Sequence, residues 1–159
     1  MWRYRSFLSL ILVILAAFLV SCSSPTTATV TQTYSPAQIQ QIQQYVPDIQ
    51  SLRDRASKEI PSLVQRKDWI DIGNFVHGPL GELRLTMNYM TRNLLPQDQA
   101  KAKEITRNFF DNLVKIDQAA QQGDARKIAL NYREAIADID SFLQVLPQER
   151  ESRKQGEES

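Results

Sequence analysis

The sequence contains only one cysteine and one histidine among its 159 residues. One cysteine excludes an internal disulfide and the Cys-x-x-Cys-His motif of haem attachment. One histidine excludes the pair of Glu-x-x-His motifs that hold a di-iron site in a helical bundle. No serine or cysteine stands in a recognisable arrangement with a base, as nucleophilic catalysis requires. We therefore expect the protein not to be an enzyme.

Neither sign of charge is in excess, because 19 Lys and Arg residues stand against 18 Asp and Glu residues. The two signs are interleaved along the chain, so no basic stripe marks a nucleic-acid site. We expect no nucleic-acid partner.

The longest hydrophobic run lies at the N-terminus, where Arg3 and Arg5 precede the uncharged stretch 7–20. A charged start followed by an apolar run is typical of an export signal. At about 1.5 Å per residue the run spans about 21 Å, less than the bilayer core of about 30 Å, so a permanent membrane span is disfavoured.

A bacterial lipobox, Leu19-Val20-Ser21-Cys22, directly follows this run. In such a motif the chain is cut before the cysteine, which carries the lipid. We therefore predict a lipoprotein signal peptide at residues 1–21 and lipidation of Cys22, the position where the motif requires a cysteine. Acylation would also remove an unpaired thiol from an exported protein. The alternative is an ordinary signal peptide with Cys22 as a chance free thiol.

The segments on either side of the central region are polar. Residues 23–33 are Ser, Thr, Pro, Ala and Gln with one valine, so residues 22–34 are predicted to form a lipidated cysteine and a short flexible linker. Residues 148–159 are almost entirely charged or polar, which predicts a disordered tail.

Between them, residues 35–147 carry apolar side chains at every third or fourth position in four stretches: 36–66, 69–94, 97–121 and 125–146. This spacing predicts four helices, each with one buried face. The connections are a few residues long, which favours neighbouring antiparallel helices. The sequence therefore predicts an all-α fold, a four-helix up-down-up-down bundle.

Helix boundaries and interruptions follow from single residues. Ser35, Asp68 and Asp124 are predicted N-caps, and Gly123 a C-terminal stop. Prolines remove a backbone donor inside helices, so bends or splits are predicted in the first stretch at Pro47 and Pro61, and in the second at Gly78-Pro79. Glycines at positions 73, 78 and 81 weaken the second helix, and we expect close approach of a neighbouring helix or partner to offset this.

The periodicity also predicts which side chains are buried. Phe110 and Val114 are expected to broaden the buried face of the third helix, and Ala125 to begin that of the fourth. Asp138 and Asp140 are expected on a solvated face. Four large side chains at helical spacing are interpreted as core rather than as a cofactor pocket: Trp69, Phe75, Met87 and Met90.

His77 is a weak zinc candidate. A histidine joined by Asp or Glu can hold zinc, but a single histidine beside a Gly-Pro break is more often a contact residue. We expect no confident metal site and no cofactor.

Several motifs occur in a distinctive order after the lipobox: Tyr34-x-Pro36-x-x-Ile39, Arg53-Asp54-Arg55, Trp69 with Phe75-Val76-His77-Gly78-Pro79-Leu80-Gly81-x-Leu83-Arg84, and Leu94-Leu95-Pro96-x-Asp98-Gln99. Together they resemble the PsbQ family of photosystem II extrinsic proteins, in its cyanobacterial lipoprotein branch. The resemblance runs from about Tyr34 to Pro147.

The resemblance implies a non-catalytic subunit on the lumenal side of photosystem II, lipid-anchored at the thylakoid membrane. Its implied partners are the photosystem II core and other extrinsic lumenal subunits, and its role is to stabilise the complex and support the oxygen-evolving centre. The resemblance selects five residues for docking or structure: Trp69, His77, Gly78, Pro79 and Arg84. Some bacterial-type members have been associated with zinc, which favours His77 slightly.

A rival hypothesis is a lipid-tethered periplasmic carrier of a metal or small ligand. It would use a pocket at the Gly78-Pro79 break.

Overall fold

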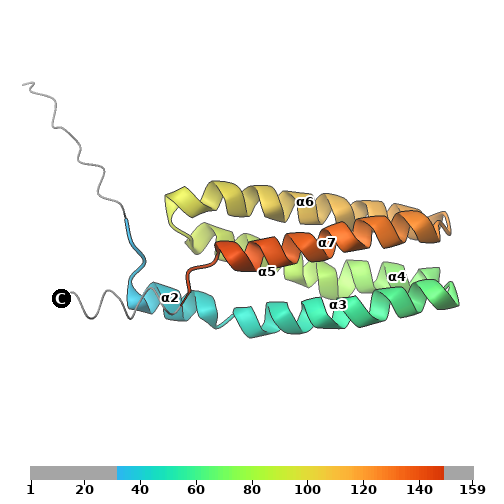
Figure 1. Ribbon diagram of the computed structural model, residues 1–159, viewed down its shortest axis with the longest axis horizontal. Coiled ribbons are helices and arrows are strands. Elements are labelled where there is room, and N and C mark those ends of the chain that lie inside the picture. Colours follow the sequence, from blue (N-terminus) through green and yellow to red (C-terminus); the bar gives the residue numbers. More distant parts are fainter. Residues whose placement is uncertain (1–31, 149–159) are drawn as a thin grey trace, which may run out of the picture. The chain divides into compact units, whose positions relative to one another are not determined.

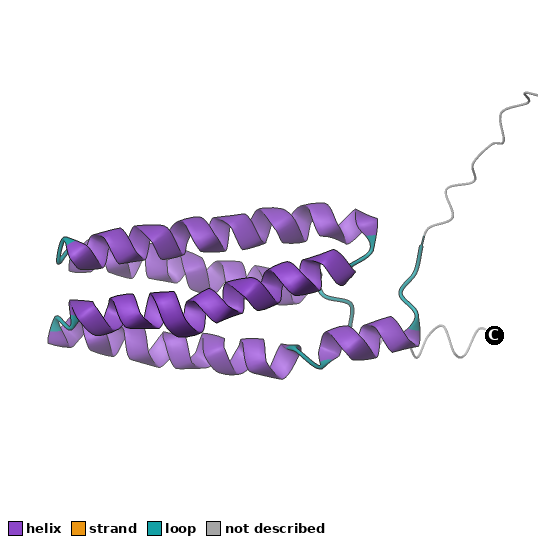
Figure 2. Ribbon diagram, turned by 180° about the vertical axis from the view of Figure 1, so that it is seen from behind, coloured by secondary structure: helices purple, strands orange, loops and turns teal. Residues whose placement is uncertain are grey.

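A computed structural model describes residues 32–148 of the chain. The predicted signal peptide, Cys22 and the polar tail from residue 149 onward lie outside the described residues, as does the linker up to residue 31. Residues 32–148 contain helices and loops but no strand, as Figure 2 shows. Among these residues, no helix is both long enough and apolar enough to cross a membrane.

The helices follow the predicted order: α2 (Pro36–Gln43), α3 (Val46–Arg66), α4 (Trp69–Phe75), the π-helix η1 (Val76–Leu80), α5 (Gly81–Asn93), α6 (Pro96–Gln121) and α7 (Ala125–Val145). The long helix α3, the combined helix α4–η1–α5, then α6 and α7 alternate in direction (Figure 1). Helix α6 packs against α7, α5 and α4, and α3 packs against α7 and α4. The predicted all-α, up-down-up-down bundle is confirmed.

The predicted N-caps are present. The Ser35 hydroxyl accepts from the backbone N–H of Gln38, whose side chain accepts in return from the Ser35 N–H, so α2 begins with a capping box. Asp68 and Asp124 cap α4 and α7 by accepting from backbone N–H groups three residues ahead.

The two prolines of the first predicted helix have different effects. The helix splits at residues 44–45, and Pro47 lies in the first turn of α3, where its missing N–H has no intrahelical partner to lose. Pro61 lies inside α3 without ending it. The predicted bend or split is therefore confirmed as a split beside Pro47, whereas Pro61 does not split α3.

The predicted interruption at Gly78-Pro79 is a π-helical turn. Residues Val76–Leu80 form η1, which joins α4 to α5 without a loop. Pro79 cannot donate to the carbonyl of Phe75, four residues earlier, and a wider turn accommodates the missing bond. The second predicted helix therefore continues past the proline without a loop.

The core is formed by the predicted apolar faces. Phe75, Met87 and Met90 are buried, and Trp69 packs against the core while half-buried. Two apolar residues of α6 are not part of it: Phe110 is 39% exposed and Val114 37% exposed. A helix turns by about 100° per residue, so these side chains point aside from their buried neighbours Phe109 and Leu113. The predicted broad buried face is therefore wrong at Phe110 and Val114.

Ala125 is also exposed rather than buried. It is the first residue of α7, at the end of the bundle.

Close packing does not explain the helical glycines of the second predicted helix. A Cβ at Gly73 would lie 3.6 Å from the Asp117 carboxylate, an ordinary contact, and one at Gly78 would meet nothing within 4 Å. Gly123 is different, because its φ of +67° is left-handed and a Cβ there would lie 3.5 Å from the Trp69 ring nitrogen.

We therefore predict that Gly123→Ala lowers the free energy of unfolding by about 1 kcal/mol, through the left-handed backbone at this helix end. Urea unfolding of the full chain measures this difference. Gly73→Ala is the matched control, because its backbone is helical and its added Cβ makes only an ordinary contact at 3.6 Å, so it should not lower the free energy of unfolding. Equal losses in the two variants would contradict the assignment.

Candidate functional site

The motif residues around Tyr34 and around the start of α6 form hydrogen bonds within the bundle. The Tyr34 hydroxyl donates to Asp98 Oδ2 at 2.7 Å and accepts from the backbone N–H of Leu95 at 3.0 Å. The Gln99 side chain donates to the carbonyl of Leu94 at 2.8 Å. These contacts tie the segment before α2 to the start of α6, so this part of the motif has a structural role.

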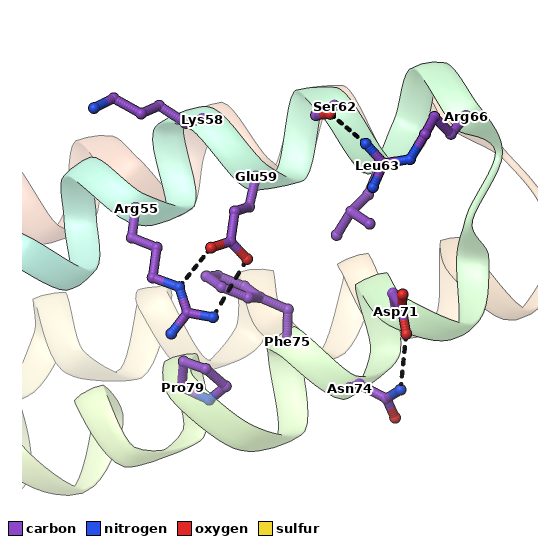
Figure 3. Close-up of a pocket in the computed structure, with 10 residues that line it drawn as sticks. All are labelled: Arg55, Lys58, Glu59, Ser62, Leu63, Arg66, Asp71, Asn74, Phe75 and Pro79. Carbon is purple, nitrogen blue, oxygen red and sulfur yellow. Dashed lines mark hydrogen bonds and ion pairs between the residues drawn. The ribbon is translucent and has the colours of Figure 1, made fainter.

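Arg53 and Arg55 also act within the bundle. Arg53 donates from Nε and from its terminal nitrogen to the two oxygens of Asp140, each at 2.9 Å, and so joins α3 to α7. This paired carboxylate is the main cause of the raised pKa of Arg53. The Asp140 side chain is 42% exposed, as expected for a solvated face, and its carboxylate also binds a neighbouring helix. Arg55 pairs with Glu59 and lies 5.0 Å from the centre of the Phe75 ring (Figure 3).

Asp138 likewise faces another helix. Its Oδ2 accepts from the Asn112 side chain of α6 at 2.9 Å, and the residue is half-buried. Burial raises the pKa of Asp138, and the hydrogen bond from Asn112 opposes the shift. The ionised carboxylate is therefore less favourable in the folded chain than in the unfolded chain.

We predict that Asp138→Asn stabilises the fold at pH 7, by less than about 1 kcal/mol because solvent screens this partly exposed group. With the folded pKa above the unfolded value, the wild-type chain loses stability as pH rises through the folded pKa, and the loss is absent below the unfolded value. Urea unfolding at pH 7 and pH 3 should show the gain at pH 7 only.

Asp140→Asn is the control for Asp138→Asn. It removes the pair with Arg53 and should lower stability at pH 7. Destabilisation of both variants at pH 7 would refute the role assigned to burial of Asp138.

Three of the five candidate residues lie apart from the other two. Trp69 packs beside Gly123, at the turn between α6 and α7. Pro79 lines an open hollow of about 540 Å³ between α3 and α4, with Gly78 beside it in η1. Figure 3 shows this hollow, whose walls carry charges of both signs: Arg55, Lys58, Arg66, Glu59 and Asp71.

His77 and Arg84 meet α6 on another face of the bundle. The His77 Nε2 atom lies 3.0 Å from Asp117 Oδ1. The Arg84 guanidinium lies 4.3 Å from the centre of the Phe110 ring, a cation–π contact. Both pairs line a hollow of about 560 Å³, which we call the α5–α6 groove; its wall also includes Leu85 and Val114.

The groove offers few ligands for a metal ion but several exposed apolar side chains. A structural zinc site takes four ligands, whereas His77 and Asp117 supply two. Within residues 32–148, no group of three or more His, Cys, Asp or Glu side chains could hold a metal ion. Exposed apolar side chains beside an arginine that is restrained by stacking, as Arg84 is on Phe110, are features of protein-binding surfaces.

The sequence motifs select His77 and Arg84, both of which line the groove, but do not predict its apolar wall. Leu85 is 61% exposed, and Phe110 and Val114 were assigned to the core. One signal was present in the sequence: α6 carries the apolar pairs Phe109-Phe110 and Leu113-Val114. One buried stripe needs only one member of each pair.

Comparison with known proteins gives the family. The sequence model of the PsbQ family, described as oxygen evolving enhancer protein 3, matches residues 3–147. The chain belongs to the PsbQ family. It is also 45% identical over 148 residues to a protein named CyanoQ from Synechocystis sp., an alignment covering 93% of this chain and 99% of CyanoQ. The resemblance of the sequence motifs to the PsbQ family is confirmed. The family model covers nearly the whole length of the chain.

Proposed function

We propose that this chain is a non-catalytic extrinsic subunit of photosystem II. It lies on the lumenal side of the thylakoid membrane, stabilises the complex and supports its water-splitting centre. The observation that carries the proposal is the family match over residues 3–147. Its partners are the photosystem II core and other extrinsic lumenal subunits.

The geometry of the bundle fits a role exerted by contact. Polar interactions such as those of Arg53 with Asp140 and Tyr34 with Asp98 join one helix or segment to another. They give the bundle a fixed form. Two candidate residues, His77 and Arg84, line an open groove that can receive a partner.

The proposal includes a lipid anchor at Cys22. The composition of residues 23–33 predicts a flexible linker, and a flexible chain of 11 residues has a root-mean-square reach of about 18 Å. The anchor thus keeps the bundle close to the membrane and raises its effective concentration near an integral-membrane partner. Two or three acyl chains hold a protein stably where one does not.

We predict that photosystem II core subunits co-purify with the tagged full chain from detergent-solubilised thylakoid membranes. Cys22→Ala removes the lipid and should lower the recovered core subunits by tenfold or more, because binding is no longer intramolecular. Quantitative mass spectrometry of the eluate measures both results. Ser23→Ala leaves the lipobox intact and serves as the matched control.

Recovery of the wild-type chain alone, under conditions that keep other extrinsic subunits attached, would overturn the proposed function. Equal recovery with the wild-type chain and the Cys22→Ala variant would leave docking supported and remove the anchor from it.

We also propose that the function requires no bound metal. His77 and Asp117 offer two ligands, so calorimetric titration with zinc should show no stoichiometric sub-micromolar site. The same titration of His77→Ala is the control. Stoichiometric sub-micromolar binding that is lost in His77→Ala would instead favour a metal carrier.

A further inference from the structure

The α5–α6 groove continues into a second hollow, of about 650 Å³, further along the same two helices. The two hollows share the side chains of Arg84, Leu85 and Phe110. The wall of the second hollow carries four cations and no carboxylate: Arg84, Arg92, Lys103 and Arg107. We call the surface formed by both hollows the α5–α6 face.

None of these four cations forms an ion pair with any residue that the structure describes. Elsewhere in the bundle, Arg53, Arg55 and Lys127 do pair with carboxylates. Since the whole chain has a net charge of only +1, the unmatched cations are a local concentration of positive charge. Such a surface attracts and orients groups of negative charge.

Exposed apolar side chains adjoin the cations. Leu85, Phe110 and Val114 are 61%, 39% and 37% exposed. The Arg84 guanidinium stacks on the Phe110 ring at 4.3 Å, which restrains its plane while leaving its N–H donors unused by any carboxylate. A restrained guanidinium loses less entropy when it binds a carboxylate.

We propose that the α5–α6 face binds an acidic segment of a photosystem II subunit. Carboxylates of that segment pair with Arg84, Arg92, Lys103 and Arg107, and an apolar side chain beside them packs on Leu85 and Phe110. The inference rests on the proposed function and adds to it the docking face and the chemistry of the partner.

A protein segment fits this face better than an anionic membrane. The surface is hollowed, whereas insertion into a bilayer needs apolar side chains that protrude. Glu82 and Asp117 line the other end of the face, and an anionic lipid surface would repel both. A polypeptide can instead place its own charges to match the two ends.

Charge reversal tests the face. Arg92→Glu combined with Arg107→Glu, in the tagged full chain, should lower co-purification of photosystem II core subunits by about tenfold. The corresponding Gln variants should lower it less. Arg126→Glu combined with Arg133→Glu changes the net charge equally on exposed positions of α7 and should bind as the wild-type chain does. Thermal unfolding of each chain confirms that it is folded.

Lys103 provides a second, covalent test. A carbodiimide activates a carboxylate and takes up the water lost as the Lys103 amine forms an amide bond with it. Mass spectrometry should find Lys103 joined to an Asp or Glu of a photosystem II subunit. Lys103→Arg keeps the positive charge, so it should keep binding while losing this cross-link.

The outcomes separate this inference from the proposed function. Suppose that the wild-type and charge-reversed chains recover photosystem II core subunits equally and that no cross-link depends on Lys103. The α5–α6 face is then not the docking face, and the proposed function stands. If the wild-type chain does not bind, both fall. If charge reversal abolishes sedimentation with anionic phosphatidylglycerol vesicles but leaves photosystem II binding unchanged, the face binds membrane and the inference is overturned.

Discussion

The arrangement of the bundle depends on the way Pro79 is accommodated inside a helix. The buried positions Ile72, Val76 and Leu80 are separated by two successive steps of four residues. In a regular α-helix two such steps rotate a face by about 80°, since each residue turns about 100°. The π-helical turn Val76–Leu80 is wider and takes up this rotation. One helix can therefore present its apolar face to the core on both sides of the proline.

The same turn positions the candidate docking residues. His77 lies inside the π-turn and Arg84 one turn into α5, and both contact α6. The side chain of Pro79 lies toward α3 instead, in the hollow of Figure 3. A single sequence block that includes His77, Pro79 and Arg84 thus serves two faces of the bundle, which explains why its residues do not form one site.

The fold could be predicted from sequence because helix periodicity, caps and prolines are local signals. Ser35, Asp124 and Gly123 each fix a boundary by their own chemistry. The site could be predicted only in part, because its defining contacts join distant residues: His77 to Asp117, and Arg84 to Phe110. Periodicity also assigns any apolar residue beside a buried one to the core, so it cannot separate Phe110 from Phe109. Which of the two rings is buried depends on how far the neighbouring helices extend around α6.

The proposed lipid anchor and the proposed α5–α6 face contribute to binding in different ways. A short flexible tether gives an effective concentration in the millimolar range, so a face with a dissociation constant near 1 mM is half occupied. Such affinity needs only a few charge pairs and one apolar contact. Those pairs are solvent-exposed and screened by salt over about 10 Å at 0.1 M. In the proposed arrangement, the lipid at Cys22 retains the subunit at the membrane, and the charged α5–α6 face makes docking to photosystem II reversible.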